Sequence, residues 1–279
     1  MAVDLHSHSH FSDGSASPTD IVEEAVRLQL TALALTDHDN LDGIDEAKRA
    51  AEQSGLHLVS GIELSCAWQP GGLHMLVYFL EPGRGPLQDR LAKLQSSRSN
   101  RNHEIVARLN TLGMQITMRD VEIEAGGTGI GRPHIAQVLV NGGVVDTISE
   151  AFDRYLAKGR PAYVERDRLE PEEAIELAAE SGAVTSIAHP HTLGLSADEF
   201  QPRLNRLRQV GLAGIEAYYS EYDPFERRQM VEVAETIGLI PTGGSDYHGT
   251  YKQGLELGRG FGDLSVPDDT VEQLQQVVS

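Results

Sequence analysis

Histidine and acidic side chains recur directly beside short hydrophobic runs of this chain. His6 and His8 follow the run at residues 3–5, and Asp37 and His38 follow "TALALT" at residues 31–36. The pattern returns along the chain at Glu63, His74, His189, Glu216, Asp246 and His248. Neutral imidazole and carboxylate together suit zinc, manganese or iron. The spacing therefore indicates a metal-binding protein.

Each residue also has a simpler interpretation. Asp37 and Asp39 could cap the helix that follows them, and His189 before Pro190 could lie in a turn. Glu63 is harder to explain in this way, because a carboxylate at a buried strand end is costly unless it is paired or ligated. His6 and His8 are two residues apart, so in an extended segment they face the same side and could hold one ion. The whole set exceeds the usual four to six ligands of one centre and favours two or three ions.

Strand-like and helix-like segments alternate over most of the chain. Strands are expected at residues 3–5, 31–36, 56–64 and 73–80, and later within "AVTSIAHP", "LAGIEAYYS" and "LIPTGGSDYHG". The helical segments between them predict mostly parallel strands covered by helices. In a parallel barrel or sheet the carboxyl ends of the strands meet on one face, so the polar residues above should collect there.

Residues 95–163 have a different texture and are expected to form a helical insertion in a barrel made of residues 1–94 and 164–279. One helix should begin near Pro133, after the glycine-rich "GGTGIGRP", and another should end at Gly159. The glycine-rich stretch weakly favours the approach of a phosphate group. Lys158, Arg160 and Tyr163 form a candidate substrate-binding cluster, although a solvated helix end explains Lys158 equally well.

The composition limits the possible partners. A net charge of −19 argues against a broad basic surface for double-stranded nucleic acid, but a small phosphorylated substrate held through metal ions is compatible with it. No apolar run approaches the roughly 18 residues needed to cross a bilayer, and the N-terminus carries no secretory pattern. Cys66 is the single cysteine, which suits a reducing compartment. These features predict a cytoplasmic protein with no membrane partner, and Cys66 is expected to be a small buried residue.

Six motifs in order resemble the PHP (polymerase and histidinol phosphatase) superfamily of metal-dependent phosphoesterases. They are "DLHSHSHFSDG", "LTDHD", "GIELS", "LHML", "IAHPH" and "GSDYH". The resemblance implies an α/β fold, a distorted TIM-like (β/α)7 barrel with a helical insertion. It also implies a trinuclear metal centre, with manganese expected and iron, zinc or magnesium as alternatives.

The resemblance also assigns metal ligands. One ion would be held by His6, His8, Glu63 and Asp246. A second would be held by Glu63, His74 and His189, with Glu63 bridging the two. A third would be held by Asp13, His38 and His248. Asp37 is expected to orient a ligand histidine.

The insertion motifs "GRPHIA" and "YLAKGRPAYV" resemble a branch that includes 3′,5′-nucleoside bisphosphate (pAp) phosphatases and 5′-to-3′ exoribonucleases. In that branch Arg132 and His134 would bind the substrate phosphate and assist catalysis, with Lys158 and Arg160 as further contacts. The expected reaction is hydrolysis of a phosphate monoester by metal-activated hydroxide. Alternative substrates are histidinol phosphate and the 5′ end of short RNA, and a non-catalytic metal-binding module is a third possibility. Four histidines are expected to be structural or superficial: His10, His57, His103 and His191.

Overall fold

The computed structural model describes residues 2–125 and 130–278, and it divides into two compact units. The first unit contains Met1–Leu91 and Arg168–Ser279, and the second contains Ala92–Asp167. Residues 126–129 of the glycine-rich stretch, where the approach of a phosphate is expected, lie outside the described residues.

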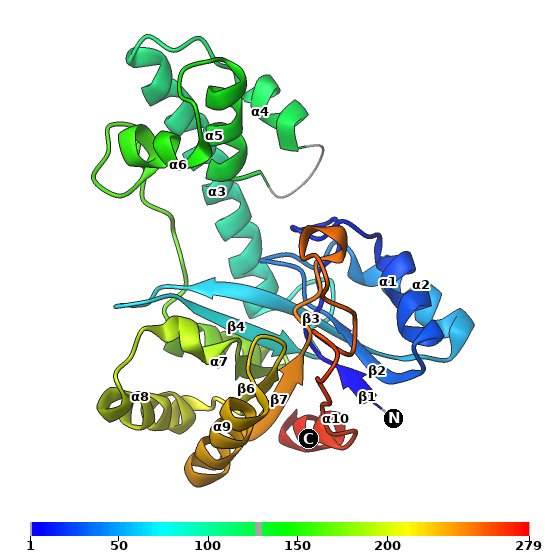
Figure 1. The fold of residues 1–279 in the computed structure, drawn as a ribbon. Coiled ribbons are helices and arrows are strands. Elements are labelled where there is room, and N and C mark those ends of the chain that lie inside the picture. Colours follow the sequence, from blue (N-terminus) through cyan, green and yellow to red (C-terminus); the bar gives the residue numbers. More distant parts are fainter. Residues whose placement is uncertain (1, 126–129, 279) are drawn as a thin grey trace. The chain divides into compact units, whose positions relative to one another are not determined.

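A seven-stranded sheet forms the centre of the first unit, with its strands in sequence order (Figure 1). The strands are β1 (Ala2–Asp4), β2 (Leu30–Leu35), β3 (His57–Cys66), β4 (Leu73–Tyr78), β5 (Val184–Ile187), β6 (Gly214–Tyr219) and β7 (Ile240–Gly244). Backbone hydrogen bonds join the two edges of the sheet. Leu5 N, just after β1, donates to Gly243 O in β7 (3.1 Å), and Asp246 N, just after β7, donates to His6 O (2.9 Å). The expected α/β fold with a seven-stranded, nearly closed barrel is confirmed.

Strand β4 runs against both of its neighbours, whereas the other neighbouring pairs are parallel. The register pairs His74, near the start of β4, with Ser65, near the end of β3. The reversal therefore brings the beginning of β4 to the face where the carboxyl ends of the other strands lie. His74 reaches the common face because of this hairpin.

Helices cover the outside of the sheet, as their sequences require. In the first unit they are α1 (Pro18–Arg27), α2 (Ile44–Ser54), α7 (Pro171–Glu180), α8 (Ala197–Val210), α9 (Pro224–Ile237) and α10 (Thr270–Val278). Ser17 caps α1, since its hydroxyl accepts from Asp20 N while the Asp20 carboxylate accepts from Ser17 N. Gly55 ends α2 in the left-handed conformation at φ 75°. Apolar side chains of α1, α2 and β2 share one buried cluster, which fixes these helices against the sheet.

The second unit is helical and has its own core. It contains most of α3 (Pro86–Thr111), then α4 (Met118–Ala125), α5 (Arg132–Asn141), α6 (Ile148–Ala151) and a π-helical turn, η1 (Phe152–Leu156). Ile105, Leu109, Ile135 and Leu139 are among its buried residues. The helix expected to run to Gly159 ends instead at Leu156, because Ala157 is extended (ψ 163°). Across the described residues, no helix is both long and apolar enough to span a bilayer.

Candidate metal centre

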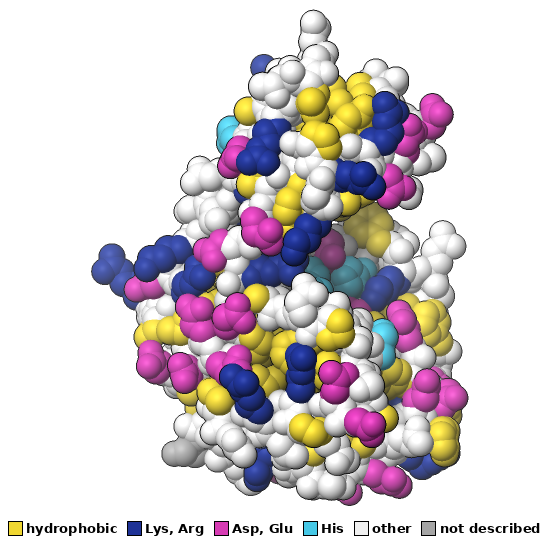
Figure 2. Space-filling model, turned by 90° about the vertical axis from the view of Figure 1, so that its left-hand side faces the viewer, with side chains coloured by type: hydrophobic (Ala, Val, Ile, Leu, Met, Phe, Trp, Pro, Cys, Tyr) yellow, Lys and Arg dark blue, Asp and Glu magenta, His cyan; other side chains and the backbone are white. Residues whose placement is uncertain are grey.

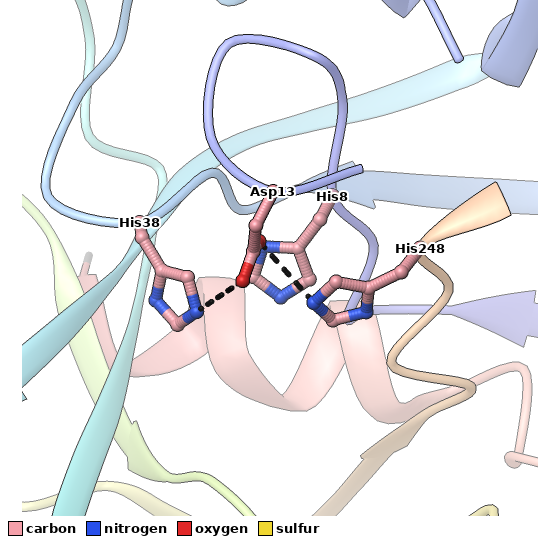
Figure 3. A group of neighbouring side chains, drawn as sticks. All are labelled: His8, Asp13, His38 and His248. Carbon is pink, nitrogen blue, oxygen red and sulfur yellow. Dashed lines mark ion pairs between the residues drawn. The ribbon is translucent and has the colours of Figure 1, made fainter. Parts of the chain in front are cut away.

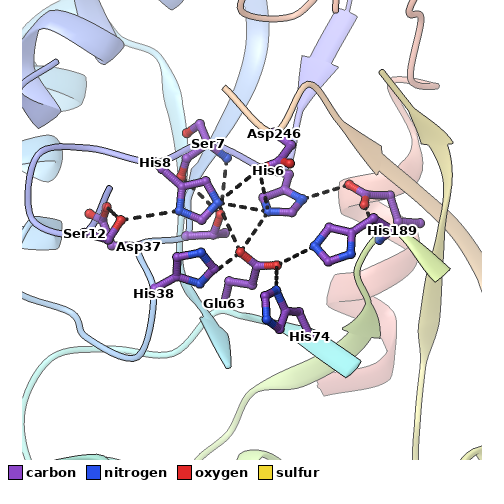
Figure 4. A network of polar contacts seen from close by, with 12 residues as sticks. His6, Ser7, His8, Ser12, Asp37, His38, Glu63, His74, His189 and Asp246 are labelled. Carbon is purple, nitrogen blue, oxygen red and sulfur yellow. Dashed lines mark hydrogen bonds and ion pairs between the residues drawn. The ribbon is translucent and has the colours of Figure 1, made fainter. Parts of the chain in front are cut away.

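The buried carboxylate of Glu63, on β3, is the hub of the candidate site (Figure 4). Its Oε1 lies 3.0 Å from His74 Nδ1 and 2.9 Å from His189 Nε2. Its Oε2 lies 3.2–3.3 Å from three more ring nitrogens: His6 Nε2, His8 Nε2 and His38 Nδ1. One carboxylate therefore faces five imidazoles, which enter the site from four strands or the segments that follow them.

Asp246, two residues after β7, is the second buried carboxylate. Its Oδ1 lies 3.4 Å from His6 Nε2 and 3.3 Å from His8 Nε2. Its Oδ2 accepts hydrogen bonds from the Tyr219 hydroxyl (3.0 Å) and the Lys252 ammonium group. The carboxylate consequently presents Oδ1 alone to the imidazoles.

Asp13 lies among the imidazoles of His8, His38 and His248 (Figure 3). Its carboxylate oxygens lie 3.2 Å from His248 Nε2 and 3.5 Å from His38 Nε2, and Oδ1 lies 3.7 Å from His8 Nδ1. The side chain of Asp13 is 55% exposed, whereas those of His8 and Glu63 are buried. This part of the centre is therefore open to solvent.

All nine residues that the resemblance assigns as ligands are brought together. Their ligand atoms fall into overlapping groups, each within 4.8 Å: His8, Asp13, His38 and His248; His6, His8 and Glu63; and His38, Glu63 and His74. Asp246 joins them through the imidazoles of His6 and His8, and His189 joins through Glu63. These groups divide the ligands somewhat differently from the three expected sets, since His8 and His38 each belong to two groups.

The nitrogen and oxygen atoms that meet in the centre are better suited to bind cations than to hydrogen-bond to one another. His6 Nδ1 donates to Glu216 Oε1 at 3.0 Å, so its other nitrogen, Nε2, is left to face His8 Nε2 at 3.0 Å. His248 repeats the arrangement, because its Nδ1 donates to the Asp246 carbonyl at 2.8 Å while Nε2 faces Asp13. His38 Nδ1 is buried and lies 3.2 Å from Glu63 Oε2, yet among the described residues it makes no hydrogen bond. Ring nitrogens and carboxylate oxygens that converge in this way are typical of a metal site.

The electrostatics of the centre also favour positive charge. Burial lowers the pKa of His8, but hydrogen bonds to Asp246 and Glu63 outweigh it and raise that pKa to about 9. Burial would raise the pKa of Glu63, yet the neighbouring imidazoles of His38 and His6 hold that pKa well below its ordinary value. The carboxylates thus remain ionised and attract cations.

Two of the nine residues have unusual backbones. His189 has φ 28° and Asp246 has φ 55°, in the region that L-residues rarely adopt. Such conformations persist only where the surrounding structure enforces them, and they cluster at functional sites. Here the strained backbones turn both side chains toward Glu63 and the imidazoles.

Two further buried carboxylates support the centre from behind, and sequence reasoning assigns a role to neither of them. The sequence places Glu216 at a strand end on the common face but gives it no role. In the structure its Oε1 accepts a hydrogen bond from His6 Nδ1, and its Oε2 accepts one from His189 N at 2.6 Å. Asp4, within the first hydrophobic run, accepts from Ser245 Oγ at 2.5 Å and from Gly258 N at 2.7 Å. The sequence signal that could have identified Asp4 is its position as an acidic residue inside a hydrophobic run.

Asp37 binds the loop that leads to Asp13. Its carboxylate accepts from Ser9 N (2.8 Å), Ser9 Oγ (2.6 Å) and Ser12 Oγ (2.6 Å). These contacts fix the segment that carries Asp13. Ser12 Oγ also lies 3.4 Å from His8 Nδ1, so the expected orientation of a ligand histidine by Asp37 would act through this serine.

The expected substrate residues all belong to the second unit. Arg132 begins α5, donates to Leu156 O at 3.0 Å, and lies over the rings of Phe152 (5.5 Å) and Tyr163 (5.7 Å). His134 Nδ1 accepts from Gly131 N at 3.1 Å, which leaves Nε2 as the second polar atom of the ring. Lys158 and Arg160 are exposed after η1. Arg132 and Tyr163 therefore lie together.

The remaining expectations concern residues outside the centre. His10, His57, His103 and His191 are exposed, and Cys66 is buried. His191 nevertheless lies beside His189, with ring centroids 6.1 Å apart.

The geometry agrees with the result of a family comparison, in which the PHP domain model matches residues 4–165. The chain belongs to the PHP domain family. As a member it is a metal-dependent phosphoesterase, a hydrolase, and the resemblance found in its motifs is confirmed.

Relatives cover nearly the whole chain. A 5′-3′ exoribonuclease of Haemophilus influenzae is 31% identical over 88% of this chain and 89% of its own length. A 3′,5′-nucleoside bisphosphate phosphatase of Chromobacterium violaceum is 28% identical over 92% of this chain and 90% of its own. The crystal structure of a protein described as a metal-dependent phosphoesterase from Bifidobacterium adolescentis superposes with a TM-score of 0.79 at 32% identity, covering 99% of this chain and 96% of that one.

Proposed function

We propose that this PHP phosphoesterase removes a phosphate group from a 3′,5′-nucleoside bisphosphate such as pAp. The observation that carries the proposal is the convergence of nine imidazole and carboxylate side chains around Glu63 and Asp246. The name of the Chromobacterium violaceum relative supports the choice of substrate.

The nine residues would hold three divalent cations, with manganese as the first candidate and iron, zinc or magnesium as alternatives. Glu63 is suited to bridge, because its two oxygens face different imidazoles: His74 and His189 on one side, and His6, His8 and His38 on the other. Bound cations would lower the pKa of coordinated water and neutralise charge on the phosphate oxygens.

The chain's own residues would orient the reactants. Glu216 holds His6 and the backbone of His189, so the ligand nitrogens remain directed at the centre. Asp13 has the most exposed side chain of the nine candidate ligands, so substrate would enter beside it. Tyr219 and Lys252 keep Asp246 turned so that a single oxygen faces the imidazoles.

Arg132 and His134 would bind the substrate phosphate. Arginine offers a planar fork of donors that matches two phosphate oxygens, and the contacts of Arg132 with Leu156, Phe152 and Tyr163 hold that fork in one orientation. Lys158 and Arg160 would add positive charge from the segment after η1. The roles of Arg132, His134, Lys158 and Arg160 rest on the proposed substrate, so the same substrates test them.

Hydrolysis of RNA from its 5′ end is the second candidate function. The Haemophilus influenzae relative bears that name, and a strand end entering a metal site needs few basic contacts. The chain is strongly acidic, and on the face shown in Figure 2 the Lys and Arg side chains lie among Asp and Glu side chains. This surface disfavours long RNA and favours a small nucleotide.

The test is turnover of matched substrates by the manganese-loaded protein. We expect release of inorganic phosphate from pAp with a higher kcat/KM than release of mononucleotides from a short 5′-phosphorylated RNA, and neither product after Glu63→Gln. Faster turnover of the RNA would favour the exonuclease function. Neither phosphate from pAp nor mononucleotides from the RNA, with metal confirmed bound, would reject both functions.

A further inference from the structure

His191 lies just outside the candidate metal centre. It belongs to the short 3-10 turn η2 (Pro190–Leu193) and is exposed. Its ring centroid is 6.1 Å from that of His189, at an interplanar angle of 60°, and 5.5 Å from that of Tyr219. His189 contacts Glu63 and Tyr219 contacts Asp246. His191 is therefore one ring further out than the candidate ligands.

Tyr222 contacts one of the two ring nitrogens of His191, Nδ1. The Tyr222 hydroxyl accepts from His191 N at 3.1 Å and lies 3.2 Å from His191 Nδ1. Because one side of the hydroxyl oxygen already accepts from His191 N, the geometry suits donation of the hydroxyl proton to Nδ1. The ring proton of neutral His191 would then be on Nε2, on the opposite side of the ring from Tyr222.

The arrangement is rigid as well as oriented. Tyr222 is 8% exposed and packs edge-on against both Tyr219 and His191, with ring centroids 5.4 and 5.5 Å apart. Tyr219 is itself tied to Asp246 through its hydroxyl. An exposed histidine whose orientation is set by two buried tyrosines presents a fixed donor toward solvent beside the centre.

We propose that His191 contacts the substrate through Nε2–H, which donates a hydrogen bond to an oxygen of the nucleotide that is not being cleaved. A phosphate held by the nine ligands would lie deeper in the centre than the imidazole of His189. His191, further out, would therefore meet the part of the substrate that projects from the centre. His191 is thereby a specificity-determining residue, and its role rests on the proposed phosphatase function.

The test compares two variants on two substrates. The side-chain amide of glutamine reaches about as far as Nε2 of histidine, whereas that of asparagine reaches only about as far as Nδ1. We expect His191→Asn to lower kcat/KM for pAp about tenfold, the effect of one lost hydrogen bond, and His191→Gln to retain most of it. With p-nitrophenyl phosphate, which has no nucleotide, both variants should match the wild type within about twofold.

Tyr222→Phe provides a second approach and His57→Asn a control. Loss of the hydroxyl frees the ring of His191, so Tyr222→Phe should lower kcat/KM for pAp but not for p-nitrophenyl phosphate. His57 is exposed at the start of β3, away from Glu63 near its end, so His57→Asn should change neither rate. Equal losses on both substrates, or no loss on pAp with His191→Asn, would overturn the contact. The wild-type rates test the proposed function separately, and a wild type that hydrolyses neither substrate would refute both.

Discussion

The carboxylate of Glu216 accepts a hydrogen bond from Nδ1 of His6 at 3.0 Å, and both side chains are completely buried. The bond takes up the outer nitrogen of the ring, so Nε2 is directed between Glu63 and Asp246. Glu216, which contacts no other candidate ligand side chain, thus determines the orientation of the His6 ring.

Replacing Glu216 should weaken metal binding without removing a ligand. In Glu216→Gln the amide NH2 opposes either the His6 ring proton or the His189 amide, so we expect a 10- to 100-fold loss of metal affinity, roughly the usual effect of such supporting groups. Titration calorimetry with Mn²⁺ measures it. Glu221→Gln, at an exposed neighbouring position, is the control. Equal affinities for the two variants would contradict the role of Glu216.

Removal of metal should lower thermal stability. Glu63 and Asp246 are buried carboxylates whose negative charge bound cations would offset, and saturation at a hundred times the dissociation constant adds about 2.7 kcal/mol to the free energy of unfolding. Chelation should therefore lower Tm, and Mn²⁺ should restore it. The restored shift should be smaller in Glu63→Gln. A Tm unaffected by chelator and metal would oppose a cation-binding centre.

Arg132 should be required as an arginine. Because the proposed contact with phosphate uses the planar fork, Arg132→Lys should lower kcat/KM for pAp by about tenfold or more, although the charge is kept. Arg154→Lys is a matched control in the same unit, where Arg154 pairs with Glu150 on the surface. Unchanged turnover by Arg132→Lys would remove Arg132 from the substrate site.

The N-cap of α1 should contribute measurable stability. Ser17→Ala removes the acceptor for Asp20 N and should lower the free energy of unfolding by about 1 kcal/mol at pH 7. Hydrogen bonds from the Ser17 hydroxyl and backbone N–H lower the pKa of Asp20, so its contribution is present above the ordinary value of 3.8 and is lost as the pH falls below it. Denaturant titrations of Asp20→Asn and wild type should therefore converge toward pH 3. A difference in free energy of unfolding that stays constant with pH would exclude the charged Asp20 carboxylate as the source of this stability.

The sequence was informative where chemistry and strand ends coincide. Glu63, His189 and Asp246 each stand beside a hydrophobic run, and parallel strands bring such positions to one face. Asp13 was different: it lies on a loop with no strand signal, and the motif resemblance alone proposed it.

Other features depend on tertiary structure that local patterns do not encode. Asp4 lies in a three-residue strand, and only its distant partners Ser245 and Gly258 explain its carboxylate. The helix end at Leu156 depends on the π-helical turn, since a helical pattern alone would continue to Gly159. The orientation of the His191 ring could not be predicted from local sequence, because it depends on Tyr222, which is 31 residues away.

Anomalous diffraction from a crystal soaked in Mn²⁺ tests the proposed metal centre most directly. We predict strong peaks coordinated by Glu63 with its imidazoles, by Asp246 with His6 and His8, and by Asp13 with His38 and His248. Peaks elsewhere in the molecule, with these nine side chains left uncoordinated at saturating manganese, would contradict the proposed centre.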